Sequence, residues 1–254
     1  MLADARFPAG GHAHSGGLEA AVNAGTVSGL GSLELFLRGR LATSGVVAAS
    51  LAAAACARAP SAGPERGAGH ERGAGPERGA GPERGAGPER GAGRESNAGP
   101  GPWALLDAEA DARTPSPAQR DASRRQGRAL LRTARAAWPA PWLEDLAGAG
   151  APPHHAVVLG AAAAAAGAAP AEAALVAAYL TMTGPATAAV RLLALDPIEV
   201  AALTARLGPA VQATAERGAA AAAGPLADLP FPSAPALDLL AEAHVRTEVR
   251  LFAS

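Results

Sequence analysis

The sequence has no lysine, one tyrosine and one cysteine among its 254 residues, and aromatic residues make up only 3% of it. The single cysteine, Cys56, excludes a disulfide or a thiolate metal cluster within one chain, and we expect it to be a small buried residue. With so few large side chains, the hydrophobic 49% of the sequence consists largely of alanine. Such a chain buries enough apolar surface only if its helices pack closely, which favours an all-α fold.

Charge and hydropathy restrict the class of protein. The formal net charge of −1 argues against a general nucleic-acid-binding protein. The N-terminus lacks the basic flank and apolar core of a signal peptide. The apolar run at residues 156–169 is interrupted by Gly167 and followed by Pro170, and its alanines favour a membrane only weakly. We therefore expect a cytoplasmic protein that does not associate with a membrane.

A low-complexity segment separates the sequence into two parts. Residues 60–102 repeat the unit Ala-Gly-Pro-Glu-Arg-Gly and contain no aliphatic side chain larger than alanine. The glycine spacing does not fit a collagen triple helix, and a β-helix would need an aliphatic residue in each turn. Without apolar surface to offset the entropy of ordering, the segment is predicted to be a disordered linker. Residues 1–59 and 103–254 are then the two helical parts of one bundle-like domain.

Hydrophobic periodicity and capping signals predict helices, and no segment shows the period of two that is typical of strands. Apolar residues at spacings of three and four from Leu33 predict one helix of about 25 residues, or two helices that break near Gly45. Ser116 and Asp196 each precede a proline and are typical of N-caps, so a helix should begin after each. Further helices are expected over residues 154–168, 171–182, 187–193 and 236–252.

The segment from Phe7 to Glu19 combines four glycines, two histidines and a carboxylate at the entry to a helix. Glycine loses more backbone entropy on ordering than any other residue, so this density indicates a loop that bends tightly or is approached closely. We interpret the loop as a partner-binding surface. Its candidate residues are Gly10, Gly11, His12, His14, Ser15 and Glu19.

The helix expected after Ser116 carries a stripe of arginines. Arg120, Arg124, Arg128 and Arg132 lie four residues apart, and only Asp121 opposes them. Like charges at this spacing repel by a few tenths of a kcal/mol, roughly. The stripe is therefore either a solvated helix face or a docking surface for an acidic partner. Nucleic acid is a weaker alternative because no aromatic residues are interleaved for base stacking.

Another side of the same helix carries small residues. Ser123, Gly127 and Ala134 share this side with Leu130 at offsets of three and four. Side chains of this size allow a neighbouring helix to approach closely, so we expect a helix contact there.

The last predicted helix has an apolar stripe that includes Leu237 and Phe252, and a polar side with Glu242, Arg246 and Arg250. Glu242 precedes Arg246 by four residues, the favourable orientation for a helical ion pair. Chain ends fray unless something holds them, so this helix either docks on the core with a solvated polar face or becomes ordered on a partner.

Histidine clusters raise the question of a metal site. His12 and His14 lie two apart and His154 is adjacent to His155, but no His-Glu-x-x-His signature or carboxylate triad accompanies them. The sequence also lacks a phosphate-binding Gly-Lys-Ser loop and a Gly-x-Ser-x-Gly elbow. We therefore expect no enzyme and no stably bound metal. The alternatives are a metal-dependent hydrolase that uses the N-terminal His/Glu loop, and a helical interaction module with no metal role.

Four motifs, in the same order along the chain, resemble the UreF family of urease accessory proteins. The first is the Pro-Ala-Gly-Gly-His-Ala-His-Ser-Gly-Gly-Leu-Glu run that ends at Glu19, and the second covers residues 120–128. The third combines His-His-Ala-Val-Val-Leu-Gly at residues 154–160 with Ala-Val-Arg-Leu at residues 189–192. The fourth is the C-terminal run of residues 244–254, with a histidine, Arg-Leu-Phe and a final serine. The glycine-rich linker departs from the family pattern.

The resemblance implies an all-α accessory protein, a homodimer, that acts in the maturation of urease by nickel insertion. Its implied partners are the UreD scaffold (also called UreH), the UreG GTPase and the urease apoprotein. Nickel is then handled transiently by the complex and is not stably bound by this chain. In the later motifs, the candidate partner-binding residues are Arg120, Arg124, Arg128, His154, Arg191, Arg246, Arg250 and Phe252.

Overall fold

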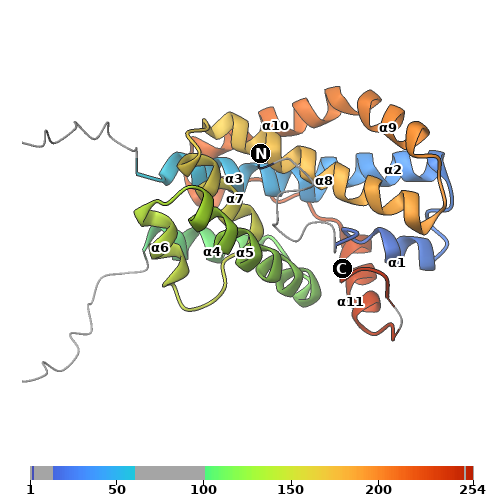
Figure 1. Cartoon of the computed structure of the whole chain (residues 1–254), viewed down its shortest axis with the longest axis horizontal. Coiled ribbons are helices and arrows are strands. Elements are labelled where there is room, and N and C mark those ends of the chain that lie inside the picture. Colours follow the sequence, from blue (N-terminus) through green and yellow to red (C-terminus); the bar gives the residue numbers. More distant parts are fainter. Residues whose placement is uncertain (1, 3–13, 61–100, 249, 254) are drawn as a thin grey trace, which may run out of the picture. The chain divides into compact units, whose positions relative to one another are not determined.

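The computed structural model describes residues 2, 14–60, 101–248 and 250–253, and among these residues it contains helices and no strand (Figure 1). The expected all-α fold is confirmed. Most of the predicted linker, residues 61–100, lies outside the described residues, as do Gly10, Gly11 and His12 of the N-terminal loop. The helices on either side of the linker belong to one compact unit.

The unit is a bundle of helices of unequal length. In chain order they are α1 (Leu18–Asn23), α2 (Leu30–Arg40), a π-helical turn (Leu41–Gly45), α3 (Val46–Arg58), α4 (Pro102–Ala112), α5 (Pro117–Ala137), α6 (Pro141–Ala147), α7 (His155–Ala165), α8 (Pro170–Leu192), α9 (Pro197–Arg206), α10 (Gly208–Ala222), a 3₁₀ turn (Leu226–Asp228) and α11 (Pro235–Val245).

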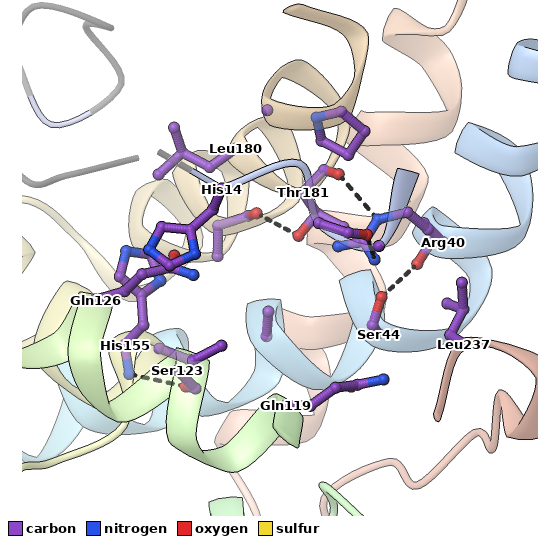
Figure 2. A pocket seen from close by; sticks show the side chains of 18 of the residues that line it. His14, Arg40, Ser44, Gln119, Ser123, Gln126, His155, Leu180, Thr181 and Leu237 are labelled. Atoms are coloured by element: carbon purple, nitrogen blue, oxygen red, sulfur yellow. Dashed lines mark hydrogen bonds between the residues drawn. The ribbon is translucent and has the colours of Figure 1, made fainter. Parts of the chain in front are cut away.

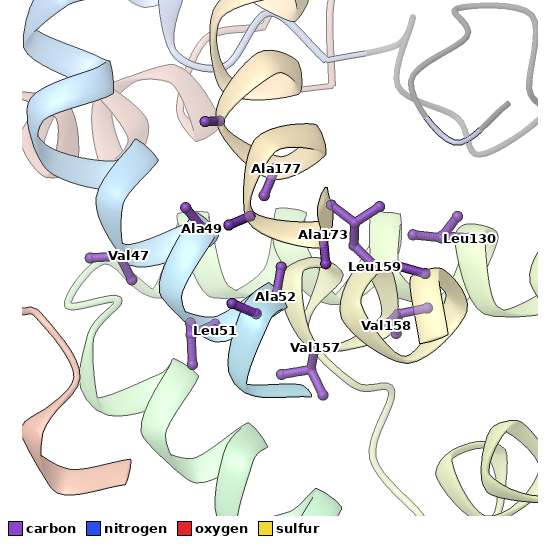
Figure 3. Packing of buried hydrophobic residues seen from close by; sticks show 14 of the residues in the cluster. Val47, Ala49, Leu51, Ala52, Leu130, Val157, Val158, Leu159, Ala173 and Ala177 are labelled. Atoms are coloured by element: carbon purple, nitrogen blue, oxygen red, sulfur yellow. The ribbon is translucent and has the colours of Figure 1, made fainter. Parts of the chain in front are cut away.

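Helix α3 is the centre of the bundle and contacts α7, α8 and α10. Its alanines from Ala52 to Ala55 are completely buried, as is Ala49. Figure 3 shows Ala52 of α3 beside Val157 of α7 and Ala173 of α8. Helix α5 covers α7, and α11 packs against both α5 and α1. The core is therefore built from closely spaced helices, as the scarcity of large side chains requires.

Glycines make the closest of these contacts possible. A Cβ atom on Gly160 of α7 would lie 2.1 Å from the Ala52 carbonyl oxygen of α3. A Cβ atom on Gly127 of α5 would lie 2.0 Å from the carbonyl oxygen of Pro153, in the segment that leads into α7. The close contact expected for the small-residue side of α5 is therefore confirmed at Gly127.

The sequence predicted either one long helix from Leu33 or two helices that break near Gly45, and a π-helical turn accounts for both predictions. Helices α2 and α3 continue into one another through residues 41–45, and the turn ends at Gly45. Among the described residues, this long helix, Leu30–Arg58, and α8 are long and apolar enough to cross a membrane by length and composition. However, 67% and 50% of their most apolar windows are buried within the fold, as is usual for core helices.

Helix α8 corrects one prediction. Two helices were expected, at residues 171–182 and 187–193. The chain instead forms a single helix with Pro185 inside it. Proline has no N–H for the carbonyl oxygen four residues earlier, that of Thr181. The Arg40 side chain of α2 supplies a donor instead, with its Nε 3.4 Å from this oxygen.

The prediction of a C-terminal helix over residues 236–252 is also corrected. Helix α11 ends at Val245 and does not continue to Phe252. The expected Glu242 to Arg246 ion pair is not formed either. The Glu242 carboxylate accepts hydrogen bonds from the Ser116 hydroxyl and, at 2.9 Å, from the Ala118 N–H, so it caps the start of α5 from a different helix. Ser116 is the N-cap of α5, as predicted, and Asp196 is the N-cap of α9. Helices α4, α6 and α10 were not predicted.

Candidate functional site

The first and last motifs of the sequence meet in the structure. Glu19 lies at the start of α1, and its carboxylate accepts hydrogen bonds from the Leu251 N–H at 2.7 Å and the Phe252 N–H at 2.9 Å. Gly16 and Gly17 precede α1 with φ angles of 61° and 86°, in the left-handed region that favours glycine. These glycines turn the chain into α1 and thereby place Glu19 against the C-terminal segment.

The side chain of Phe252 is buried in this junction, which we call the terminal junction and which consists of Glu19, Arg191, His244, Leu251 and Phe252. The Arg191 guanidinium of α8 lies over the Phe252 ring, 5.0 Å from its centroid. His244 is buried as well, with its Nε2 3.3 Å from the Phe252 carbonyl oxygen and 3.8 Å from the Glu19 carboxylate. The structure thus joins Glu19, Arg191 and Phe252, which separate motifs singled out, with His244, the histidine of the C-terminal motif.

A second cluster joins α4, α5 and the start of α7. The Arg124 guanidinium bridges two carboxylates of α4, with nitrogen to oxygen distances of 2.8 Å to Asp107 and 2.7 Å to Asp111. His154 is buried; its Nε2 lies 2.8 Å from Asp111 and its Nδ1 lies 3.0 Å from the Ser123 hydroxyl. The cluster therefore uses both ring nitrogens of His154, and Nε2 is the donor to the Asp111 carboxylate.

The ligand atoms of Asp107, Asp111 and His154 all lie within 4.8 Å of one another, a spacing that would suit a metal ion. Arg124 already bridges the two carboxylates, so the cation in this cluster is a guanidinium. Arg124 and His154 therefore position α5 and α7 in this structure and do not form an outer surface. The opposing carboxylates were missed because α4 was not predicted.

We expect Asp111→Asn to change the pH dependence of stability. Burial raises the pKa of Asp111, but the hydrogen bond from His154 and the charge of Arg124 outweigh burial and hold that pKa below its ordinary value. A depressed folded-state pKa gives stability that is fully present above the unfolded-state pKa of about 3.9 and is lost as the pH falls through the folded-state pKa. Urea unfolding should therefore show a smaller loss of stability for Asp111→Asn than for the wild type between about pH 6 and about pH 3.

The matched control is Asp121→Asn, which removes an exposed carboxylate paired with Arg125. Because that pair is solvated, its removal should change the unfolding free energy by less than about 1 kcal/mol. At about pH 6, Asp111→Asn should cost about 1 kcal/mol or more through the lost hydrogen bonds. Identical pH dependence in the wild type and Asp111→Asn would contradict a stabilising role for this carboxylate.

Other predicted site residues remain on the surface. Arg128 and Arg132 of α5 are exposed and form no ion pair with any described residue. Arg246 and Arg250 are exposed after α11, beside Leu251, which is 73% exposed. The arginine stripe is therefore divided, because Arg120, like Arg124, contacts neighbouring groups and donates to the Thr114 carbonyl oxygen. The exposed arginines define two cationic surfaces. Arg128 and Arg132 form one on α5, and Arg246 and Arg250 form the other near the C-terminus.

A cavity of about 920 Å³ lies between α2, α3, α5, α7, α8 and α11. Figure 2 shows His14, Gln126 and His155 at one end and Arg40 at the other. Burial, reinforced by the charge of His14, lowers the pKa of His155 to about 4, so this imidazole is neutral at pH 7. Sequence reasoning missed Arg40, which is one of two arginines in the last turn of α2.

Comparison with known proteins shows which proteins the chain as a whole resembles. A model of the family described as UreF matches residues 27–208. The chain is 47% identical over 254 residues to the urease accessory protein UreF of Mycolicibacterium vanbaalenii, covering 100% of this chain and 96% of that protein. It is 46% identical over 253 residues to UreF of Mycobacterium marinum and 42% identical over 255 residues to UreF of Mycobacterium tuberculosis, with the same coverage.

Proposed function

This chain belongs to the UreF family of urease accessory proteins, and on that premise we propose that it promotes urease maturation by nickel insertion, as an adaptor between the UreG GTPase and the UreD (UreH) scaffold. The observation that carries the proposal is the similarity to urease accessory proteins over the full length of the chain. An adaptor of this kind acts in the cytoplasm, as a homodimer in complex with the urease apoprotein. It holds no nickel of its own and passes nickel on within the complex.

Two exposed surfaces support an adaptor role. Arg128 and Arg132 on α5 offer a cationic face to an acidic partner, and Arg246 and Arg250 form a second face beside the exposed Leu251. Separate surfaces allow two partners to bind at once, so that a change in one partner alters affinity for the other through a coupling free energy of about 1 to 3 kcal/mol. The N-terminal loop, which includes His12 and His14, is proposed as a further partner contact.

The alternative of a hydrolase is less well supported. It would require the Glu19 carboxylate as a base or a metal ligand. Both carboxylate oxygens of Glu19 instead accept backbone N–H groups within a buried junction. That arrangement suits a group that holds two chain segments together.

We expect coexpression to test the function directly. Urease produced with its accessory proteins but without this chain should contain little nickel, and the full set should restore nickel loading. Arg250→Ala should weaken complex assembly and lower the nickel content, because it removes an exposed cation from the C-terminal surface. Arg206 on α9 is also exposed, so Arg206→Ala is the matched control and should leave both unchanged.

Each result distinguishes the candidate functions. Nickel loading that is unaffected by omission of the chain would overturn the proposal. Binding to UreG and UreD without any effect on nickel content would instead support the interaction module with no metal role. The two measurements are the nickel-to-protein ratio of purified urease and the recovery of each accessory protein with a tagged form of this chain.

A further inference from the structure

Arg40 brings an uncompensated positive charge to the cavity. Its Nη1 donates to the Gly16 carbonyl oxygen at 2.5 Å and its Nε donates to that of Thr181 at 3.4 Å. A guanidinium has five N–H donors, so three remain. Arg40 forms no ion pair with any described residue, and its guanidinium carbon lies 5.9 Å from the centroid of the Phe36 ring.

The charge persists at neutral pH. Burial lowers the pKa of Arg40 to about 10, which leaves the guanidinium protonated at pH 7. Partial removal of a cation from water is unfavourable unless an anion compensates for it. The Asp238 carboxylate lines the same cavity but forms no ion pair with Arg40 among the described contacts. The charge that acts on Asp238 is that of Glu242.

The remaining wall of the cavity is suited to an amphipathic molecule. Leu237 of α11 provides apolar surface beside Arg40, and Leu180 of α8 provides it farther along the cavity, toward His14. At the other end, Gln126 is half-buried, and its side-chain amide forms no hydrogen bond with any described residue. The cavity thus combines a cation, an apolar wall and a free amide, and its volume lies within the range of about 300 to 1,000 Å³ that is usual for ligand sites.

We propose that this cavity binds a carboxylate-bearing ligand with an apolar body, and that the carboxylate pairs with Arg40. The planar guanidinium presents parallel N–H groups that match the two oxygens of a carboxylate. The apolar body extends from Arg40 along Leu237 and toward Leu180. The inference rests on the cavity alone and does not depend on a role in urease maturation.

Binding of hexanoate to the purified full chain tests the proposal. Calorimetric titration should give a dissociation constant of about 1 mM or lower for hexanoate and at least tenfold weaker binding of hexanamide, which has the same chain but no charge. Arg40→Met should weaken hexanoate binding at least tenfold, whereas Arg38→Met should not. Arg38 is a suitable control because it lies on the same helix, is exposed and is paired with Glu34.

A pair of acetylated and amidated peptides, Leu-Glu-Leu and Leu-Gln-Leu, distinguishes the source of the carboxylate. Preference for hexanoate supports a free small carboxylate, and preference for the glutamate peptide supports an acidic segment of a partner protein. If Arg40→Met fails to fold, Leu180→Trp keeps Arg40 and fills the apolar wall, and it should abolish binding. Absence of binding by both carboxylates, or equal binding of hexanoate and hexanamide, would overturn the proposal.

Discussion

Gly160→Ala should destabilise the protein by about 3 kcal/mol, a large effect for the addition of one methyl group. The new Cβ would lie 2.1 Å from the Ala52 carbonyl oxygen and 2.7 Å from the Ala55 Cβ, both on α3. Neither neighbour is the flexible end of a side chain, so relief requires α7 to move away from the central helix. Because the core depends on short distances between helices, such a movement loses packing along the whole contact.

Gly39→Ala is the matched control for this substitution. Gly39 is exposed in α2, and a Cβ there would meet no atom within 4 Å. Alanine is the better helix former, so Gly39→Ala should stabilise the protein by about 0.5 to 1 kcal/mol. Urea unfolding monitored by circular dichroism measures both changes. Equal stability of Gly160→Ala and the wild type would show that α7 and α3 are less tightly packed than the structure indicates.

The same packing explains why the fold class could be predicted from composition. Scarce aromatic residues and abundant alanine leave closely packed helices as the way to build a core. Local signals with a direct physical cause also held: Ser116 and Asp196 cap α5 and α9 because their side chains accept backbone N–H groups. Gly127 marked a close helix contact because only glycine fits at such a distance.

Predictions failed where a distant residue overrides a local signal. Two helices were expected at residues 171–182 and 187–193, but one helix runs through Pro185. Arg40, 141 residues from Thr181 in sequence, donates to the Thr181 carbonyl oxygen that the proline leaves free. Helix α4 was missed although Trp103, Leu106 and Ala110 have helical spacing and are buried. That spacing was available in the sequence, whereas the contribution of Arg40 was not.

The candidate site was predicted only as separate parts. Motifs singled out Glu19 and Phe252, but no sequence pattern indicates that residues 233 positions apart share a hydrogen bond. His154 and Arg124 were interpreted as partner contacts, and the structure places both in an internal network with Asp111. Motifs therefore singled out residues that take part in these internal contacts, while the assignment of surface or internal contact required the fold.

The terminal junction gives the second large prediction, that Glu19→Gln releases the C-terminal segment. Glutamine keeps the shape of the side chain but places an NH₂ group against one of the two backbone N–H donors, at Leu251 or Phe252. Loss of hydrogen bonds to a charged acceptor costs about 1.5 to 3 kcal/mol each. Hydrogen exchange of these two amides should therefore accelerate by about 100-fold, which corresponds to about 2.7 kcal/mol.

Glu34→Gln is the control, because Glu34 pairs with Arg38 on the exposed side of α2. This substitution should leave the hydrogen exchange of both amides unchanged. Phe252→Ala should mimic Glu19→Gln, since it removes the ring that fills the junction beneath Arg191. Unchanged protection of both amides in Glu19→Gln would contradict the hydrogen bonds on which the junction is based. Glu19 is buried, but it anchors the segment that carries Arg250 and Leu251. We therefore expect Glu19→Gln to weaken the binding of any partner at the C-terminal surface.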